Sequence, residues 1–551
     1  MKTLIRLFAI FLALFSTNLF AQDNSYEALI KLYSSPTSTG TARFQAIGGN
    51  HSALGADVSS ASGNPAGLGF YTRSEFSFTP GYQSTSNSSV YAVEPGKTTN
   101  SNVNNFNIAN IGVIFAGQEP RFKDGWRGTF GISYSRQNTL YNNVQFTGNG
   151  ADKSSITDSY AEGINNQISP RDPNVKPSLT IGDLVNSINN APNDMSSSGL
   201  YYWSFLVDET GNAKNPLASY EASAKVNQKY DFQSTGRVSQ WNISYGGTAN
   251  EKFYIGGTIG LPSFKYETVK NFSEINQVYK SISGFTDTRI LSASGSGFNL
   301  SIGAIYKPND MLRFGLNFVS PTWYDIDEST STSLKVDVDP NKGINVSDFN
   351  PSLLDKLTSV GYKISSKKTI TSIPKLSTPT YDDNYQMRTP LKLNGGAAIF
   401  FKKKGFVSAD VEYVAYRGMN LSTTVIDSPI QDDLDNGNDN VKFNYKNVLN
   451  IKVGGEYRIG MMSLRGGLSY YEDPYSSQYK KKFNDDTNRS QMIYSAGIGY
   501  RTNQFYVDLT GLYGSIISGA TPYRLVDTRD YASAKINNSY VKGVVSFGVF
   551  F

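Results

Sequence analysis

Much of the chain after residue 74 alternates between apolar and polar residues, a period of two that is typical of β-strands with two different faces. In residues 298–318 the apolar positions are Phe298, Leu300, Ile302, Ala304, Tyr306, Leu312, Phe314, Leu316 and Phe318. The positions between them are small, polar or charged: Asn299, Ser301, Gly303, Arg313, Gly315 and Asn317. Such strands fit a sheet with lipid on one side and water on the other.

Very short polar turns join these strands in pairs. One such turn is Lys307 to Asp310, and similar turns are expected at residues 248–252, 402–405, 459–462 and 501–504. In the hairpin after Leu391, the predicted outward residues are Leu393, Gly395, Ala397, Ile399, Val407, Ala409, Val411 and Tyr413, and the inward set includes Lys392, Asn394, Asp410 and Glu412. A basic residue on the lipid face costs roughly 2–4 kcal/mol near the bilayer centre, so the register is strongly fixed.

The end of the chain has the pattern of a closing barrel strand. Within Tyr540 to Phe551, one face carries Val541, Val545, Phe547, Val549 and Phe551, and this terminal aromatic strand resembles the assembly signal of bacterial outer-membrane barrels. When both ends lie on the side of the short turns, the strand number is even. Counting from Ser74 gives about fourteen strands, with residues 220–247 taken as one. We predict an all-β fold, a transmembrane antiparallel up-and-down β-barrel spanning residues 74–551.

Two insertions, near residues 148–218 and 328–383, are far longer than barrel turns, and we expect both on the extracellular side. The first holds a helix-like stretch and a dense apolar run, and the second holds apolar residues at helical spacing after Asn350-Pro351. The candidate ligand groove consists of Leu200, Tyr201, Tyr202, Trp203, Phe205, Leu206, Leu353, Leu354 and Leu357. The alternative is that these side chains form the core of folded loops.

Composition supports a secreted membrane protein. Lys2 and Arg6 flank the start of a short apolar stretch that ends near a cleavage site after Ala21, so residues 1–21 are predicted to be a signal peptide. The 551 residues include 50 Gly and no Cys, which excludes a disulfide framework and a thiolate metal site. The net charge of +5 is scattered, with no basic block, and we expect no nucleic-acid partner.

Residues 22–73 carry no membrane pattern and are rich in Gly, Ala and Ser, which allows close packing inside a barrel. This segment contains Asn64, Pro65, Ala66 and Gly67. Here the sequence resembles the FadL/TodX family of outer-membrane hydrophobic-compound transporters, particularly its Bacteroidetes branch. Asn64-Pro65-Ala66 corresponds to the family's hatch signature, and residues 391–417, 447–471 and 494–513 match its strands and turns in spacing and type.

The resemblance implies a fourteen-stranded barrel in the outer membrane of a Gram-negative bacterium, with residues 22–73 as an internal hatch. It implies passive passage of long-chain fatty acids or similar apolar compounds, captured at the extracellular loops and released by hatch rearrangement or lateral opening. The expected partners are a hydrophobic small molecule or lipid, outer-membrane lipids and lipopolysaccharide, and the barrel-assembly machinery, with the barrel a monomer. The loops differ from the family's, so its ligand contacts are not carried over.

Charged residues at inward positions have two interpretations, a polar path or ion pairs between the hatch and the wall, and we favour the second. They are Asp410, Glu412, Lys452, Glu456, Arg458, Arg465 and Asp508. His51, the single histidine, is a weak candidate for a haem ligand, and no cofactor is otherwise expected. One histidine also argues against a His-dependent hydrolase, so we predict a protein that is not an enzyme. The alternatives are a PorV-like secretion shuttle and a haem receptor.

Overall fold

The computed structural model describes residues 26–35, 38–91, 97–117, 125–149, 155–171, 176–212, 215–219, 226–276, 281–339, 341–425, 428–483, 485–523, 525 and 533–551. The predicted signal peptide, residues 22–25 of the predicted hatch, and residues 220–225 of the predicted long strand lie outside these ranges. Among the residues described, none of the helices is both long and apolar enough to cross a bilayer.

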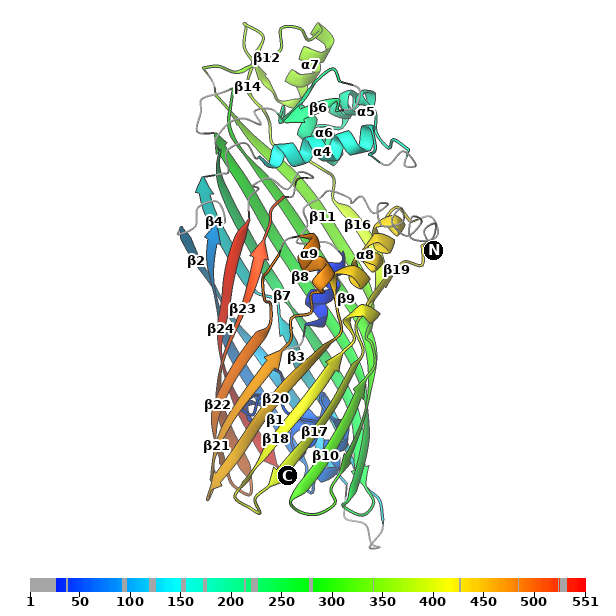
Figure 1. The fold of residues 1–551 in the computed structure, drawn as a ribbon, viewed down its shortest axis with the longest axis vertical. Helices are drawn as coiled ribbons and strands as arrows, with labels where there is room; N and C mark the ends of the chain where they lie inside the picture. Colours follow the sequence, from blue (N-terminus) through cyan, green and yellow to red (C-terminus); the bar gives the residue numbers. More distant parts are fainter. Residues whose placement is uncertain are drawn as a thin grey trace, which may run out of the picture.

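The strands form a closed antiparallel barrel of 14 wall strands, the number expected from the sequence (Figure 1). We call each wall strand a stave, because some of them are interrupted and carry two β labels. Ten staves are continuous: β1 (Glu75–Tyr91), β2 (Thr98–Ala116), β7 (Val226–Thr248), β8 (Phe253–Asn276), β9 (Ile282–Tyr306), β20 (Val448–Ile459), β21 (Met462–Tyr471), β22 (Gln491–Arg501), β23 (Phe505–Ala520) and β24 (Ala534–Phe550). The other four are interrupted: β3 (Arg127–Thr139) with β4 (Asn142–Asn149), β10 (Leu312–Val319) with β11 (Trp323–Val338), β16 (Tyr381–Arg388) with β17 (Lys392–Phe400), and β18 (Gly405–Val414) with β19 (Asn420–Ser422).

The barrel closes where its first and last strands meet. β24 pairs antiparallel with β1, from Glu75 opposite Phe550 to Tyr91 opposite Ala534. Each remaining stave pairs with its neighbours along the chain, as an up-and-down meander requires. Closure leaves no free strand edge where the first and last strands meet. A membrane-spanning β-structure needs such closure because lipid cannot form hydrogen bonds with unpaired backbone groups.

The alternating sequence pattern becomes an apolar outer face and a polar lumen. Ile302 is 65% exposed on the outer face, whereas the adjacent Ser301 is buried on the inner one. In the hairpin of β17 and β18, Leu393, Ile399, Val407 and Val411 are exposed, and Asn394, Asp410 and Glu412 are buried. Exposed apolar side chains recur in this way around the wall, so the barrel presents the lipid-facing surface of an outer-membrane protein.

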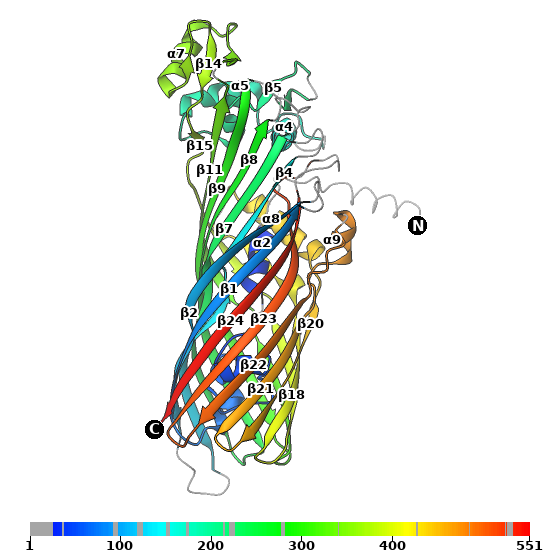
Figure 2. The same ribbon diagram turned by 90° about the vertical axis from the view of Figure 1, so that its left-hand side faces the viewer.

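The staves differ greatly in length, and the long ones carry a cap above the barrel (Figures 1 and 2). β7, β8 and β9 have 23, 24 and 25 residues, whereas β21 has 10. The long strands extend into the segments expected to be loops: β4 ends at Asn149, β11 continues to Val338, and β16 begins at Tyr381. The second insertion is therefore shorter than predicted, because its polar ends pair as strands beyond the apolar belt.

The first insertion contributes α4 (Ile156–Ile168), α5 (Ile181–Asn186), η3 (Ser187–Asn190), α6 (Ser197–Trp203), β5 (Val207–Glu209) and β6 (Leu217–Ser219) to the cap. The second contributes β12 (Ile344–Asn345), α7 (Pro351–Val360), β13 (Lys363–Ile364), β14 (Thr369–Ser372) and β15 (Leu376–Ser377). Above the shorter staves lie η4 (Tyr416–Gly418), α8 (Gln431–Asn444) and α9 (Ser477–Lys482). The helix expected after Asn350-Pro351 is α7, capped by the Asn350 side chain.

The N-terminal segment lies inside the barrel (Figures 1 and 2). Its elements are α2 (Tyr26–Ser34), α3 (Ala42–Ala46), η1 (Val58–Ala61) and η2 (Pro65–Phe70). α2 lies at mid-height, and the following turns lie in the lumen nearer the short-turn end (Figure 2). An internal N-terminal segment is what the fold prediction required.

Candidate functional site

Short polar caps shape the hatch from its own sequence. The Thr41 side chain accepts a hydrogen bond from the Phe44 N–H at the start of α3, and the Asp57 side chain accepts one from Ser59 at the start of η1. Asn64 caps η2 by accepting from the Ala66 N–H at 3.1 Å. Each cap satisfies an N–H group that would otherwise be unpaired at a helix start, which holds the hatch in short turns.

Asn64 also joins the hatch to itself and to the wall. Its Nδ2 donates to the carbonyl oxygen of Ser52 at 2.6 Å. The same amide lies 3.4 Å and 3.3 Å from the wall carbonyl oxygens of Ala304 and Leu316. The predicted motif residues, namely Asn64, Pro65, Ala66 and Gly67, are all buried. The motif therefore sits where the hatch meets β9 and β10.

Inward-facing glycines let the hatch backbone approach the wall closely. A Cβ atom at Gly315 would collide with the Ser52 carbonyl, and one at Gly303 would collide with the Asn64 side chain. The same conflict with hatch atoms would arise at Gly246, Gly256, Gly396, Gly454 and Gly467. Sequence analysis missed these residues as part of the site. The sequence feature that could have indicated them is glycine at inward strand positions, where a barrel otherwise carries polar side chains.

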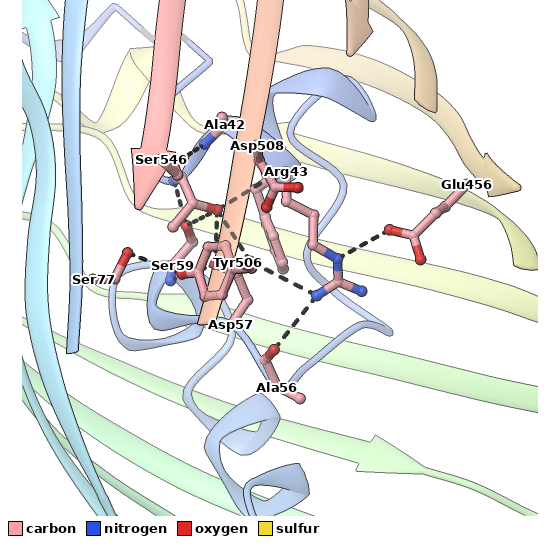
Figure 3. Close-up of polar contacts among 12 residues, drawn as sticks. Ala42, Arg43, Ala56, Asp57, Ser59, Ser77, Glu456, Tyr506, Asp508 and Ser546 are labelled. Atoms are coloured by element: carbon pink, nitrogen blue, oxygen red, sulfur yellow. Dashed lines mark hydrogen bonds and ion pairs between the residues drawn. The ribbon is translucent and has the colours of Figure 1, made fainter. Parts of the chain in front are cut away.

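A first group of lumenal charges surrounds Arg43 of α3 (Figure 3). Arg43 Nε donates to Glu456 Oε2 at 3.2 Å, and Arg465 Nε donates to the same oxygen at 2.8 Å. Arg465 continues to Asp508 at 2.5 Å, and Arg458 pairs with Glu456 at 2.6 Å. Four residues predicted from the sequence thus form one network, and Glu456 joins this network to Arg43 of the hatch, which was not predicted.

The surroundings of Arg43 keep it charged. Burial alone would lower the pKa of its guanidinium, but the Glu456 and Asp57 carboxylates raise it well above its usual value. The adjacent Ala42 N–H donates to Ser546 Oγ at 2.7 Å, and its carbonyl accepts from Thr510 at 2.7 Å. Helix α3 is therefore fixed to the wall by ion pairs and by hydrogen bonds.

A second group of lumenal charges holds the turn after α3. Asp410 Oδ2 accepts from the backbone N–H groups of His51 and Ser52, each at 2.9 Å. Nearby, Lys452 lies 3.5 Å from Glu412. The His51 ring packs at Gly63, where an added Cβ would contact it. Within the described part of the chain, His, Cys, Asp and Glu residues form no group of three or more suited to a metal ion.

Apolar side chains of the wall face the lumen below the cap and pack around helix α2 of the hatch, and we call the part of the lumen that they enclose the apolar chamber. We define it by the inward side chains of Val238, Phe264, Tyr266, Leu291, Tyr324, Ile326 and Met387, which belong to one buried cluster. Leu434 and Val441 of α8 close its side, and Leu29, Ile30 and Tyr33 of α2 pack within the same cluster. Apolar side chains facing the lumen of a membrane barrel depart from its usual polar interior.

The wall is interrupted beside this chamber. β2 pairs with β3 only from Asn110 opposite Ser135 to Ala116 opposite Thr129. Past a bulge between Arg136 and Asn138, the chain continues along β7 as β4, which has no ladder with β2. Leu140, between β3 and β4, belongs to the chamber cluster. The ladder between β2 and its next neighbour therefore stops next to the chamber.

The cap brings both predicted groove segments together. Leu200, Tyr201, Trp203, Leu206 and Leu357 are buried in one core, and Tyr202, Phe205, Leu353 and Leu354 are partly buried against it. Contacts between the insertions include a hydrogen bond of 2.8 Å from the Tyr362 hydroxyl to the Trp203 carbonyl. The segments pack on each other, as the alternative interpretation of these residues requires.

A buried polar cluster anchors the cap to the barrel mouth. Glu274 of β8 accepts from Ser155 Oγ at 2.5 Å and from the Ile156 N–H at 2.9 Å, at the start of α4. Gln228 of β7 donates to Glu274 at 2.8 Å. A carboxylate at a helix N-terminus is favourable, so Glu274 both caps α4 and ties it to the wall.

The closed wall, its apolar outer face and the hatch in the lumen define an outer-membrane β-barrel with an internal N-terminal plug. The chain has the fold of a FadL homologue from Pseudomonas aeruginosa, with a TM-score of 0.52 and 11% identity over 93% of this chain and 99% of that one. The fold that the resemblance implied is thus confirmed.

Other solved structures align over similar lengths. They include the toluene transporter TodX of Pseudomonas putida, with a TM-score of 0.48 and 12% identity, covering 93% of this chain and 99% of that one. The toluene transporter TbuX of Ralstonia pickettii has a TM-score of 0.44 and 13% identity, with the same coverage of 93% and 99%. The sequence matches no model of a known protein family and no curated protein.

Proposed function

We propose that this protein is a passive channel for small hydrophobic molecules, such as long-chain fatty acids or similar apolar compounds. The observation that carries the proposal is the apolar chamber inside a barrel whose lumen also carries many buried polar and charged side chains. Removal of apolar surface from water favours binding by about 25 cal/mol per Å² and needs no directional contact. Such a chamber suits solutes that share hydrophobicity more than shape.

The lateral exit is the release route that the geometry favours. The hatch is fixed by ion pairs and hydrogen bonds on several sides, so its displacement requires many contacts to break. The interruption between β2 and β4 lies beside Leu140, a member of the chamber cluster. Phe106 and Ile108 of β2 are exposed on the outer face at this level. A solute leaving there passes from the chamber into the bilayer without crossing water.

The test is mass spectrometry of compounds extracted from protein purified from native membranes. The expected result is enrichment of one class of apolar small molecule over a barrel of similar size purified in the same detergent. Recovery of a secreted protein in place of small molecules would support the shuttle alternative and contradict the channel. Recovery of haem would support the receptor alternative.

A further inference from the structure

Helix α2 occupies the apolar chamber with its own side chains. Leu29, Ile30 and Tyr33 are 2%, 0% and 5% exposed. The Tyr33 ring stacks on Phe264 with centroids 4.1 Å apart and meets the edge of Tyr266 at 5.9 Å. An aromatic ring with adjacent aliphatic groups is what an apolar solute would present to the same wall.

The contacts of α2 differ in kind from those of the rest of the hatch. α3 is fixed by the Arg43 ion pair and by hydrogen bonds to Ser546 and Thr510. α2 packs mainly through apolar side chains, and the buried hydroxyl of Tyr33 has no hydrogen-bond partner among the described residues. Apolar contacts of this kind can be exchanged for those of another apolar molecule. A polar contact that must break when α2 moves is the 3.1 Å hydrogen bond from the Tyr445 hydroxyl to the Glu27 carbonyl.

The length of α2 makes it dependent on these contacts. The helix has 9 residues, and helices shorter than about 12 residues are marginal in water without packing. The helix is therefore stabilised by its packing against the chamber wall. A molecule that binds to the same wall takes these contacts away from α2 and destabilises the helix there.

We propose that α2 is an exchangeable occupant of the chamber, and that solute and α2 compete for the same apolar wall. This inference rests on the proposed channel function. With α2 in place the chamber is filled, so only molecules in which α2 has left can bind solute. The apparent affinity for solute is the intrinsic affinity multiplied by the fraction of such molecules. The cap above and the fixed hatch below stay in place while α2 moves.

The structure offers a covalent test. A Cβ at Gly437 of α8 would lie 3.4 Å from the Cβ of Tyr26, close to the spacing of about 3.5–4.5 Å that a disulfide requires. The chain has no cysteine, so the double variant Tyr26→Cys with Gly437→Cys can form one disulfide only. Oxidation would lock α2 against α8 in the full-length protein.

The measurement is binding of the neutral fluorophore N-phenyl-1-naphthylamine to purified protein in detergent. We expect the oxidised double variant to bind roughly tenfold or more weakly than its reduced form, with affinity restored by dithiothreitol. The two single-cysteine variants are the matched controls and should not respond to oxidation. Equal affinity in the oxidised and reduced forms would overturn the inference while leaving the channel proposal intact.

A second variant keeps the inference testable if the double variant does not fold. Leu29→Ala with Tyr33→Ala weakens the hold of α2 on the wall and leaves the wall itself unchanged. We expect several-fold tighter binding of the fluorophore than in the wild type. Unchanged or weaker binding would contradict the exchange. Absence of binding in every form, including this one, would overturn both the exchange and the channel function.

Discussion

Glu456 links three arginines, two from the wall and one from the hatch, and its side chain is almost completely buried. Replacing it by Gln leaves Arg43 without its nearest carboxylate. Breaking a buried ion pair costs about 3–5 kcal/mol, because an uncompensated charge stays in place. We expect Glu456→Gln to loosen α3 and to expose the hatch to added protease.

The control for this variant is Glu267→Gln. Glu267 pairs with Lys265 at 2.7 Å on the surface, where the two side chains are 49% and 58% exposed. Exposed pairs contribute about 0–1 kcal/mol, so proteolysis of the hatch should not change. Equal protease resistance of both variants would show that the Glu456 cluster does not hold the hatch.

Gly315 tests the close approach of hatch and wall. In Gly315→Ala the new methyl group meets the backbone carbonyl of Ser52, which cannot rotate away as a side chain could. We expect the hatch to shift and the barrel to leak ions, measured as a higher single-channel conductance in planar bilayers. Gly511→Ala is the matched control, since nothing lies within 4 Å of its Cβ position. Matching conductance in the two variants would contradict this view of the hatch contact.

The cap is joined to the barrel by a shared apolar core and by polar contacts, and Glu274 provides two of the polar contacts at the start of α4. In Glu274→Ala, the Ile156 N–H at the start of α4 loses its acceptor and Gln228 loses a partner. We expect the cap to be cleaved faster by protease, while the barrel keeps its heat-modifiable migration on gels. Loss of the barrel itself would mean that the cap and the wall are not separable in this way.

The elements differ in how far the sequence predicts them. Period-two alternation predicted the staves, because successive side chains of a strand face the lipid and the lumen in turn. The short turns were predicted where this alternation breaks between two strands. The helix after Asn350-Pro351 was predicted by its cap and its apolar spacing, and it became α7. Strand ends above the membrane were not predicted, because the Ser and Thr residues there face water on the outside and carry no apolar pattern.

The site was less accessible to sequence analysis than the fold. The inward charges were predicted because alternate residues of a strand face the lumen. Arg43, their partner in the hatch, lies in a segment without a regular hydrophobic pattern, so the sequence does not indicate where its side chain points. The place of α2 in the chamber depends on wall residues as distant as Phe264 and Met387, which meet only after the barrel closes. The apolar residues that face the lumen were not predicted either. A strand with apolar residues on its inner face has the same alternating sequence pattern as one with apolar residues on its outer face.

The apolar belt makes a prediction for the molecule as a whole. Val453 is 42% exposed on the outer face of β20, between the exposed Ile451 and Tyr457. An arginine there costs roughly 2–4 kcal/mol if the position lies near the bilayer centre. We expect Val453→Arg to lower the urea midpoint for unfolding in lipid vesicles.

Ser86 provides the matched control for Val453. It lies on the same outer side of β1 as Tyr82, four residues further from the short-turn end. Ser86→Arg should leave the urea midpoint unchanged, because this position is expected to face water. Equal destabilisation of the two variants would place the belt at a different height.

A passive channel conducts apolar solutes through its lumen without an energy source. The most direct measurement is uptake of radiolabelled oleate and toluene by cells lacking the gene and by cells complemented with it, with and without a protonophore. For a passive channel, we expect that complementation restores uptake of at least one of the two and that the protonophore does not reduce the initial rate. Identical uptake in both strains, or uptake abolished by the protonophore, would contradict the channel function.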